Sequence, residues 1–480
     1  MYNVRMKRAR YILCGFAAAA IIVSLIFFAA YAGENVGYTR ESVHTSAENL
    51  ARGKRVEAAA RSPGLFTDGD YSTYITMRAK TGSVVVDLGE PAVFNTVILR
   101  EKGFNVKEFS VFYLDAEGEY RFLLRQDKIE DYRYLAFSPV TSSKLKIEIT
   151  DSIAIPRLIE CEAFNVPKKP GGFTAAGYLI SGRIPKNVIK GEPFDYGIFS
   201  GYDRFTVISG VKMNPEDGTA VERISENGES ELKITTDAIH AQSVLLNKRH
   251  EVFITVSGVE TALLKSKARG ASIVNIAELA EKYGADGIDF NWEFPVGEED
   301  FRLFSAYITD VKAEFAARNI KLSLALYGWG QSLFGEEARV AIDYVNLMGY
   351  DQYDQDGNGG SFLSGVLQPV NYFLDLGFPR EKIVLGMPFY GTPVNAVTRQ
   401  IGFGNPVFRR ENYFDNRLIN GATGEVCAFN SPQLIYDKTA YAIHSGLSGV
   451  FCWEIGADVD SGNEYSLLKA IVRAKEERMI

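Results

Sequence analysis

The chain of 480 residues is poor in cysteine and has no excess of positive charge. Its four cysteines are widely spaced and form no CxxC pair, which argues against a zinc or redox motif and against a dense disulfide framework. The formal net charge is −8, whereas a nucleic-acid-binding protein normally carries a basic patch. The sequence therefore indicates neither a metal-thiolate site nor a nucleic-acid partner.

Long apolar runs are also scarce, and only the N-terminus carries one. Four basic residues lie within the first ten positions, and Tyr11–Gly33 then contains no charge. This run approaches the ~20 residues that span a bilayer, which favours a signal-anchor. The small-x-small triplet Ala30–Ala32 favours a cleaved signal peptide instead. Both alternatives make residues 1–33 a targeting segment and predict an extracellular protein, either secreted or anchored to the membrane through residues 11–33.

After a polar linker at residues 34–48, residues 49–166 consist of short β-rich runs separated by turn residues. This pattern predicts an all-β jelly-roll sandwich. The segment resembles the discoidin-type, galactose-binding-like domains that serve as carbohydrate-binding modules. The matching pieces are Asn49–Val56, Asp68–Tyr74, Val84–Glu90 and Pro156–Phe164.

That resemblance implies a structural calcium ion beside the first loop of the β domain. The corresponding residues are Asp68, Asp70, Thr73 and Glu160. An oxygen-only set of ligands suits calcium. An Asp-Gly turn that needs no metal explains the same loop equally well, so the sequence leaves both alternatives open.

Residues 173–480 follow the linker Pro167–Gly172 and alternate between strand and helix patterns. Apolar spacing predicts helices over Ser272–Tyr283 and Phe301–Arg318, with Gly284 in a position typical of a helix C-cap. Eight strands in about 300 residues predict an α/β fold of the (β/α)8 TIM-barrel type. The alternative is a doubly wound open sheet, but no GxGxxG turn follows the first strand.

One stretch, Asp286–Pro295 (DGIDFNWEFP), carries polar residues at every second position of an apolar segment. If it is a strand, Asp289, Asn291 and Glu293 share one face. Buried carboxylates are costly unless they have a function, so the pattern indicates a strand that ends at an active site. The alternative is an ordinary half-buried strand whose polar residues face solvent.

These residues resemble glycoside hydrolase family 18, the chitinase and endo-β-N-acetylglucosaminidase family. Its signature DxxDxDxE maps onto Asp286, Asp289, Asn291 and Glu293. Further family motifs follow the order of the barrel strands: a partial SxGG at Ser257–Glu260, MxYD at Met348–Asp351, and stretches similar to the seventh and eighth strands at Lys382–Gly391 and Gly449–Asp458.

The resemblance implies hydrolysis of β-linked N-acetylglucosamine glycans with retention of configuration and without a catalytic cofactor. The 2-acetamido oxygen of the substrate attacks the anomeric carbon, while Glu293 protonates the leaving oxygen from a mostly apolar pocket. The implied catalytic residues are Glu293, Asp289, Asn291 and Tyr350. The implied substrate-binding residues are Asp351, Met348, Trp453, Tyr390 and Tyr178, whereas Asp286 and Ser257 are structural.

The sequence departs from the family at Asn291, where the pattern has aspartate. An amide oxygen can still accept a hydrogen bond from the acetamido N–H, but it supplies no charge, unless Asp289 supplies it instead. We therefore expect a weakened enzyme, with a lectin-like carbohydrate-binding protein as the alternative. The interval from Gly391 to Gly449 is short for an inserted domain, so we expect a shallow groove. Chitin, N-glycan cores and peptidoglycan-type polymers all carry the required acetamido group.

Overall fold

A computed structural model describes most of the chain. The described residues are 47–327, 333–353, 359–361, 363–394, 399–408, 416–419 and 423–480. The predicted signal or anchor at residues 1–33 and nearly all of the linker at 34–48 lie outside them. Within the described residues, no helix is both long and apolar enough to cross a membrane. The chain divides into two compact units, Met1–His44 and Thr45–Ile480, and the description below concerns the second unit.

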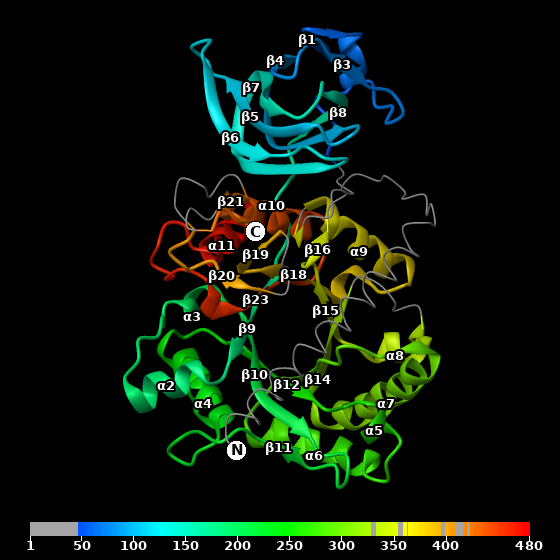
Figure 1. The fold of residues 1–480 in the computed structure, drawn as a ribbon, viewed down its shortest axis with the longest axis vertical. Helices are drawn as coiled ribbons and strands as arrows, with labels where there is room; N and C mark the ends of the chain where they lie inside the picture. The colour runs from blue at the N-terminus through cyan, green and yellow to red at the C-terminus, as the bar shows by residue number, and fades with distance from the viewer. Residues whose placement is uncertain are drawn as a thin grey trace. The chain divides into compact units, whose positions relative to one another are not determined.

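The first part of this unit, here called the β-module, is an antiparallel sheet that precedes the barrel (Figure 1). Its strands are β1 (Arg55–Ala58), β2 (Ala60–Arg61), β3 (Ile75–Met77), β4 (Gly82–Glu101), β5 (Val106–Leu114), β6 (Tyr120–Asp127), β7 (Arg133–Ser152) and β8 (Arg157–Phe164), with a short 3-10 helix, η1, at Pro63–Phe66. The strand order is β2-β3-β8-β4-β7-β5-β6, and β1 pairs with β4. Phe94, Phe109 and Leu145 are fully buried in its core. The all-β prediction is confirmed as an antiparallel sheet.

The rest of the unit is a closed parallel barrel. Its strands are β9 (Thr174–Ile180), β10 (Arg204–Met213), β12 (Glu251–Ser257), β13 (Gly287–Phe290), β14 (Lys321–Tyr327), β15 (Tyr344–Met348), β18 (Ile383–Pro388) and β23 (Gly449–Trp453). They pair in sequence order, and β9 pairs with both β23 and β10. That last pairing closes the sheet, so the (β/α)8 prediction is confirmed and the open doubly wound alternative is wrong.

Helices surround the barrel (Figure 1). They are α2 (Arg183–Lys190), α3 (Ile198–Gly201), α4 (Glu231–Leu245), α5 (Thr261–Leu264), α6 (Arg269–Lys282), α7 (Gly297–Arg318), α8 (Glu336–Ala341), α9 (Leu363–Asp375), α10 (Pro432–His444) and α11 (Leu467–Arg478). The two predicted helices correspond to α6 and α7, which begin three and four residues earlier than expected. Gly284 adopts a φ of 59° after α6, which confirms the predicted helix end.

Short strands add to the barrel between its sixth and eighth strands. The hairpin strands β16 (Gln352–Tyr353) and β17 (Gly359–Gly360) follow β15, whereas β19 (Tyr390–Pro393), β20 (Ile401–Gly402), β21 (Arg417–Ile419) and β22 (Val426–Ala428) form an antiparallel sheet after β18. The interval after Gly391 therefore holds a small four-stranded sheet before α10. This elaboration was not predicted from the sequence.

The predicted linker is fixed by backbone pairing. The N–H of Lys169 donates to the carbonyl of Arg478 at 2.7 Å, and the N–H of Ile480 donates to the carbonyl of Lys169 at 2.7 Å. Lys168 Nζ also donates to the carbonyl of Glu476 at 3.0 Å. The segment that joins the β-module to the barrel thus pairs with the end of α11.

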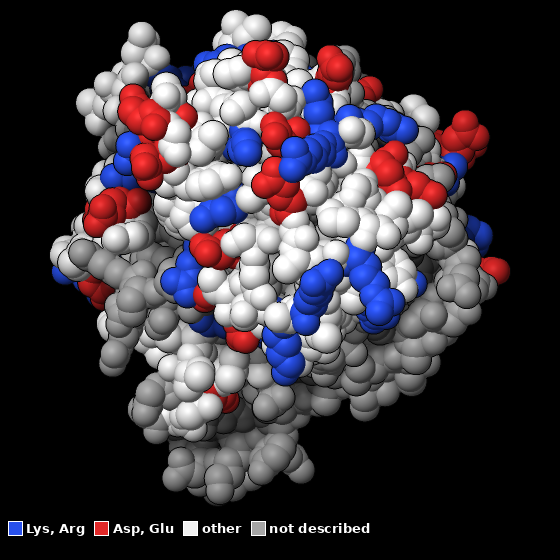
Figure 2. Space-filling view, turned by 90° about the horizontal axis from the view of Figure 1, so that it is seen from above, with Lys and Arg blue, Asp and Glu red and all other residues white. Residues whose placement is uncertain are grey.

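Charged side chains of both signs are spread over the face that Figure 2 draws. Ion pairs on the β-module include Arg55 with Glu57 at 3.3 Å and Lys144 with Asp87 at 3.8 Å. Exposed pairs of this kind contribute little to stability, typically about 0–1 kcal/mol. They bear on solubility more than on the fold.

Candidate active site

The strand β13 is shorter than the sequence predicts. It pairs with Val256 of β12 and Leu324 of β14 as far as Phe290, and there the pairing ends. Asp289 therefore lies on the strand, whereas Asn291 and Glu293 lie in the loop before α7. The prediction of one ten-residue strand with three polar residues on one face is wrong beyond Phe290. The neighbouring strands continue beyond this point, to Ser257 in β12 and Tyr327 in β14, so it is the chain after Phe290 that leaves the sheet.

The apolar side of this segment packs against helix α7 as the alternation predicts. The ring centroid of Phe290 lies 6.0 Å from that of Tyr307 and 6.5 Å from that of Phe304. Trp292, beyond the end of the strand, also packs against Phe304, at 5.2 Å between ring centroids. These contacts turn Asp289 towards the barrel interior, because successive side chains of a strand point to opposite faces.

Asp289 is completely buried and accepts four hydrogen bonds. Ser323 Oγ and Asn346 Nδ2 donate to Oδ1 at 2.6 and 3.0 Å, and the Tyr178 hydroxyl and Thr255 Oγ1 donate to Oδ2 at 3.0 and 3.2 Å. Burial raises the pKa of this carboxyl, and the four donors oppose the rise. The four donors come from β9, β12, β14 and β15, so Asp289 joins strands across the barrel interior.

Asp286 lies at the other end of β13. Its Oδ2 accepts the backbone N–H of Val252 at 2.9 Å, and its Oδ1 pairs with Arg249 Nη2 at 2.6 Å. Ser257, at the end of β12, donates its hydroxyl to the carbonyl of Val211 at 3.1 Å. Both side chains thus join neighbouring strands or the loops beside them, and neither contacts Glu293 among the described residues.

Asn291 and Glu293 form a pair in the loop after β13. Asn291 Nδ2 donates to Glu293 Oε1 at 3.0 Å. Asn291 Oδ1 is buried and has no hydrogen-bond partner among the described residues. The amide orientation follows from the pair, because the opposite orientation would place two acceptor oxygens together. One buried acceptor therefore remains available beside the carboxylate.

Glu293 itself is exposed, and the mostly apolar pocket expected around it stays a prediction. The early end of β13 carries Glu293 beyond the barrel interior. The next residue, Phe294, contacts Tyr327 at the end of β14, with ring centroids 4.6 Å apart. The peptide bond between Glu293 and Phe294 is cis.

The strand β15 ends at Met348, and Gly349, Tyr350 and Asp351 follow it. Tyr390 donates its hydroxyl to Asp351 Oδ1 at 2.6 Å, and its ring lies 6.2 Å from that of Tyr350. Burial raises the pKa of Asp351 to about 6, and the charge of Glu293 contributes to the rise. Glu293 also helps to raise the pKa of Tyr350, where burial is again the main cause. The charge of Glu293 thus acts on both Tyr350 and Asp351.

Aromatic residues line the barrel interior at this end. Trp453 ends β23 and is partly buried, with its ring 5.5 Å from that of Tyr178. Tyr178 is only 2% exposed, and its hydroxyl is engaged by Asp289 and by Asn346 Nδ2. Met348 and Tyr390 are buried in the same cluster. Tyr178, one of the residues predicted to bind substrate, is thus enclosed in the barrel interior and packs against Trp453.

Sequence reasoning missed three of the side chains that hold Asp289. Thr255 and Ser323 lie directly opposite Asp289 in the register of the neighbouring strands, and Asn346 lies one strand further along. Each is a polar residue in the middle of an otherwise apolar strand. That pattern is a usable signal once the register of the barrel is known.

The predicted calcium residues in the β-module have mixed geometry. Thr73 Oγ1 donates to Asp68 Oδ2 at 2.9 Å, and Gly69 N donates to Glu160 Oε2 at 3.1 Å. Glu160 Oε1 is buried without a hydrogen-bond partner among the described residues, and burial raises the pKa of this carboxyl to about 8. Asp70, in contrast, accepts from Ser72 in its own turn. Within the described residues, no group of three ligating side chains is preassembled.

The comparisons with known proteins concern the barrel region. Residues 246–458 match the family model for glycosyl hydrolases family 18. Relatives include "Probable chitinase 2" of Drosophila melanogaster, 23% identical over 42% of this chain and 54% of its own length. The class V chitinase of Arabidopsis thaliana is 26% identical over 41% of this chain and 64% of its own length. The chain thus spans between half and two thirds of the length of these curated relatives.

A solved structure shows the same fold. The chitinase ChiB of Flavobacterium johnsoniae superimposes with a TM-score of 0.51 at 22% identity, covering 64% of this chain and 94% of its own. At this identity the likeness concerns the fold alone. The C-terminal region of this chain is therefore a closed barrel with the fold of that chitinase, and its residues 246–458 are similar to glycosyl hydrolases family 18.

Proposed function

We propose that the barrel is a glycosidase that hydrolyses β-linked N-acetylglucosamine glycans of the chitin type, with Glu293 as general acid and base. The observation that carries the proposal is the exposed Glu293 carboxylate, held by Asn291 at the carboxyl end of β13 and electrostatically coupled to Tyr350 and Asp351. Active sites of (β/α)8 barrels lie at this end of the strands. The chitinase relatives support the same reaction class.

The first chemical step needs one proton donor and one internal nucleophile. Glu293 gives its proton to the glycosidic oxygen while the bond from that oxygen to the anomeric carbon breaks. The acetamido oxygen of the same sugar forms a new bond to that carbon, which gives an oxazolinium-like intermediate. Glu293, now a carboxylate, then takes a proton from the water that opens the intermediate. Configuration is retained because the carbon is attacked twice.

The remaining residues orient the sugar. The unpaired Oδ1 of Asn291 can accept the acetamido N–H, which aims the acetamido oxygen at the anomeric carbon. Tyr350 and Asp351 are proposed to hold the acetamido group and the sugar hydroxyls. Trp453, partly buried at the end of β23, offers an aromatic face for the apolar side of the ring. The mechanism calls on no catalytic cofactor.

The second candidate is a carbohydrate-binding protein on the same barrel without turnover. One observation favours it: the side chain beside Glu293 is an amide, which brings a hydrogen-bond donor where the mechanism profits from negative charge. The retained carboxylate of Glu293 favours the enzyme, because binding alone does not need a proton donor.

Incubation of the protein with chitooligosaccharides and with a high-mannose N-glycopeptide, followed by mass spectrometry of the products, separates the two. The enzyme predicts cleavage of at least one substrate, its abolition by Glu293→Gln, and retention of sugar binding in that variant. Glu298→Gln, an exposed glutamate in the first turn of α7, is the matched control and should cleave normally. Tight binding without any product from the wild-type protein would sink the enzyme proposal.

The β-module is proposed to be a discoidin-type, carbohydrate-binding domain with a structural calcium ion. The residues that fit such an ion are Asp68, Thr73 and Glu160, and the unpaired buried oxygen of Glu160 supports them. Calcium would replace the proton that burial otherwise favours on this carboxyl. The N-terminal sequence supports the further proposal that the protein acts outside the cytoplasm, either secreted or membrane-anchored.

A further inference from the structure

Lys438 on α10 is a fully buried lysine whose hydrogen bonds among the described residues go to uncharged acceptors, although the charge of Glu130 acts on it. Its Nζ donates to the carbonyl and the hydroxyl of Ser361 at 2.9 and 2.7 Å, and to Asn430 Oδ1 at 2.7 Å. Burial of an ammonium group costs several kcal/mol unless its surroundings compensate. Burial lowers the pKa of Lys438 well below its usual range. So costly a side chain calls for a role that an apolar residue could not fill.

The three acceptors lead directly to the candidate active site. Ser361 Oγ donates its own proton to the carbonyl of Gly349 at 2.6 Å. Because a carbonyl oxygen can only accept, the Ser361 hydroxyl gives its proton to Gly349 and accepts from Lys438. Gly349 immediately precedes Tyr350 and Asp351. The lysine thus supports the hydroxyl whose hydrogen bond holds the start of this turn.

The turn leaves little freedom to compensate for a lost anchor. A Cβ placed on Gly349 would come within 2.8 Å of the carbonyl oxygen of Gly386, so the backbone already packs against β18. Asp351 adopts a φ of 56°, a conformation that aspartate tolerates but that its surroundings must hold. Tyr390 holds the Asp351 side chain from the same direction as β18. Among the described residues, Ser361 restrains the start of the turn at the Gly349 carbonyl.

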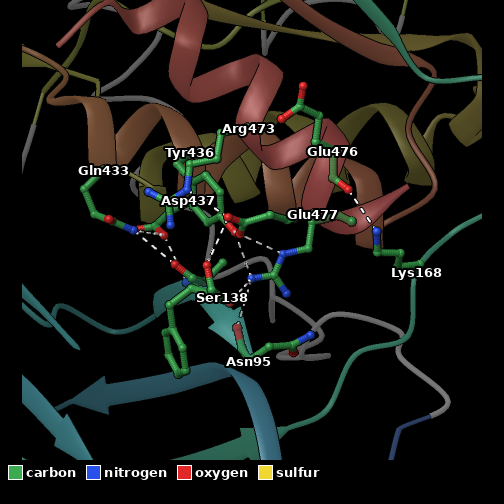
Figure 3. Close-up of polar contacts among 12 residues, drawn as sticks. Asn95, Ser138, Lys168, Gln433, Tyr436, Asp437, Arg473, Glu476 and Glu477 are labelled. Atoms are coloured by element: carbon green, nitrogen blue, oxygen red, sulfur yellow. Dashed lines mark hydrogen bonds and ion pairs between the residues drawn. The ribbon is translucent and has the colours of Figure 1, made fainter. Parts of the chain in front are cut away.

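Helix α10 provides a fixed base for the lysine, because its other side is bonded to the β-module. Asp437 Oδ1, on the residue before Lys438, accepts the backbone N–H of Ala136 on β7 at 2.9 Å. Gln433 Nε2 donates to the carbonyl of Ala136 at 3.1 Å and to Asp437 at 2.9 Å. Figure 3 shows Gln433 and Asp437 on α10 turned towards the strands of the β-module. Adjacent residues of one helix thus contact the β-module and the active-site turn.

The helix start is held in the same way. Ser431 caps α10, and its backbone N–H donates to Asn416 Oδ1 at 2.7 Å. Asn416 Nδ2 donates in turn to Asp127 Oδ1 of β6 at 3.2 Å. The neighbouring Asn430 donates to the Ser361 carbonyl at 3.1 Å while accepting from Lys438. Polar contacts therefore run continuously from the β-module through the start of α10 to Ser361.

We propose that Lys438 is a positioning residue, which acts through Ser361 on the Gly349 carbonyl to hold Tyr350 and Asp351 in their working arrangement. The inference rests on the proposed function, since it concerns the reaction in which those two residues take part. A buried apolar side chain could fill the same space, but it could neither support the Ser361 hydroxyl nor bridge it to Asn430.

The test compares Lys438→Met with Lys382→Met. Lys382 also donates to two backbone carbonyls, of Val340 and Ile342 at 2.8 and 2.7 Å, but it ends the 3-10 turn just before β18, at the opposite end of the barrel. Both variants lose a lysine that bonds to carbonyls, so both are expected to lose stability. Only Lys438→Met is expected to lower kcat on a chitooligosaccharide, by at least about tenfold, because small displacements of positioning groups carry penalties of that order.

Ser361→Ala and Ser361→Thr extend the test and carry it alone if Lys438→Met does not fold. The alanine variant should lower kcat like Lys438→Met, and the threonine variant should restore it, because it keeps the hydroxyl. Each kcat is measured at a temperature equally far below the melting point of that protein. The proposal would be overturned by equal kcat values for Lys438→Met, Lys382→Met and the wild type. Full activity of Ser361→Ala would overturn it as well.

The outcome remains separable from that of the proposed function. If the wild-type protein cleaves no substrate, the proposed function fails, and the positioning role is then read from the calorimetric Kd for the same chitooligosaccharide. An approximately tenfold weaker Kd for Lys438→Met, but not for Lys382→Met, supports the positioning of Tyr350 and Asp351. Equal Kd values contradict it.

Discussion

Replacement of Asn291 by aspartate tests the electrostatics of the candidate site directly. In the wild-type structure Asn291 Nδ2 donates to Glu293 Oε1 at 3.0 Å. A general acid has to carry a proton before the bond breaks. The introduced carboxylate would lie about 3 Å from Glu293, and two carboxylates so close together share one proton. The Asn291→Asp variant should thus hold the proton that the first step needs.

The size of the effect follows from the charge that develops on the substrate. The intermediate carries a positive charge, and the removal of one preorganised electrostatic group commonly costs about 3 kcal/mol in the transition state. Each 1.36 kcal/mol corresponds to a factor of ten, so restoring the group corresponds to about a hundredfold in rate. Solvent reaches Glu293 and screens part of this interaction. We therefore expect a rise in kcat between about tenfold and a hundredfold.

Single-turnover cleavage of a chitooligosaccharide, quantified by chromatography of the products, measures the chemical step free of product release. The Asn291→Asp, Glu293→Gln double variant is the control, and it should be inactive because the introduced carboxylate cannot replace the proton donor. Asn291→Ala should be slower than the wild type, since it loses the acceptor for the acetamido N–H. A rate for Asn291→Asp equal to or below that of the wild type, with sugar binding retained, would refute the reasoning and indicate a pocket adapted to the amide.

Three further predictions concern protonation and stability. The pKa of Asp351 is raised to about 6, so this group becomes charged only above that pH; kcat/KM should rise through pH 6 in the wild type, and Asp351→Asn should remove that limb of the profile. Burial raises the pKa of Glu160 from an ordinary 4.5 to about 8, so between these pH values the folded protein keeps a proton that the unfolded chain loses. The protonated carboxyl therefore contributes its full share to the free energy of unfolding below about pH 4.5, and this share declines as the pH rises towards 8. In EDTA, the Glu160→Gln variant should accordingly raise Tm at pH 8 more than at pH 5. Added calcium should raise Tm at pH 8 in the wild type but not in the variant. A change in Tm on Glu160→Gln that is the same at both pH values would contradict this prediction. Arg478 Nη2 donates to the carbonyls of Asn95 and Phe137 at 3.1 and 2.6 Å. Arg478→Met should therefore lower the free energy of unfolding, measured in urea, by about 2–4 kcal/mol. The control Arg473→Met removes an ion pair with Glu477 on the same helix and should lower it by less than about 0.5 kcal/mol.

The barrel could be predicted from the sequence because each element carries its own local signal. The apolar spacing of α6 and the glycine at position 284 identify a helix and its end without reference to any other part of the chain. The end of β13 carries no such signal. DGIDFNWEFP alternates without interruption, yet the strand stops at Phe290, although β12 and β14 continue to Ser257 and Tyr327. The alternation of polar and apolar residues thus does not mark the point at which the chain leaves the sheet.

The same limit applies to side chains that act through neighbours. Thr255, Ser323 and Asn346 are single polar residues in apolar runs, and their common partner is apparent only when the strands are aligned. Lys438 follows Asp437 in α10, and a pair of charged residues of this kind is typical of an exposed helix face, yet both are completely buried. The cost of burying a lysine is invisible in the sequence, because it depends on the β-module and the site loop that cover α10.

The geometry also decides which carboxyl can compensate for the amide at position 291. Asp289 cannot approach the substrate charge without breaking some of its four hydrogen bonds inside the barrel, and none of those bonds reaches Asn291. Asp351 is different, because its pKa responds to the charge of Glu293 and its carboxylate is fixed by a single hydroxyl from Tyr390. If the wild-type protein turns over substrate, Asp351 is therefore the carboxyl that can offset the positive charge of the intermediate. The gain in rate of Asn291→Asp then measures how much of that stabilisation Asp351 leaves unsupplied.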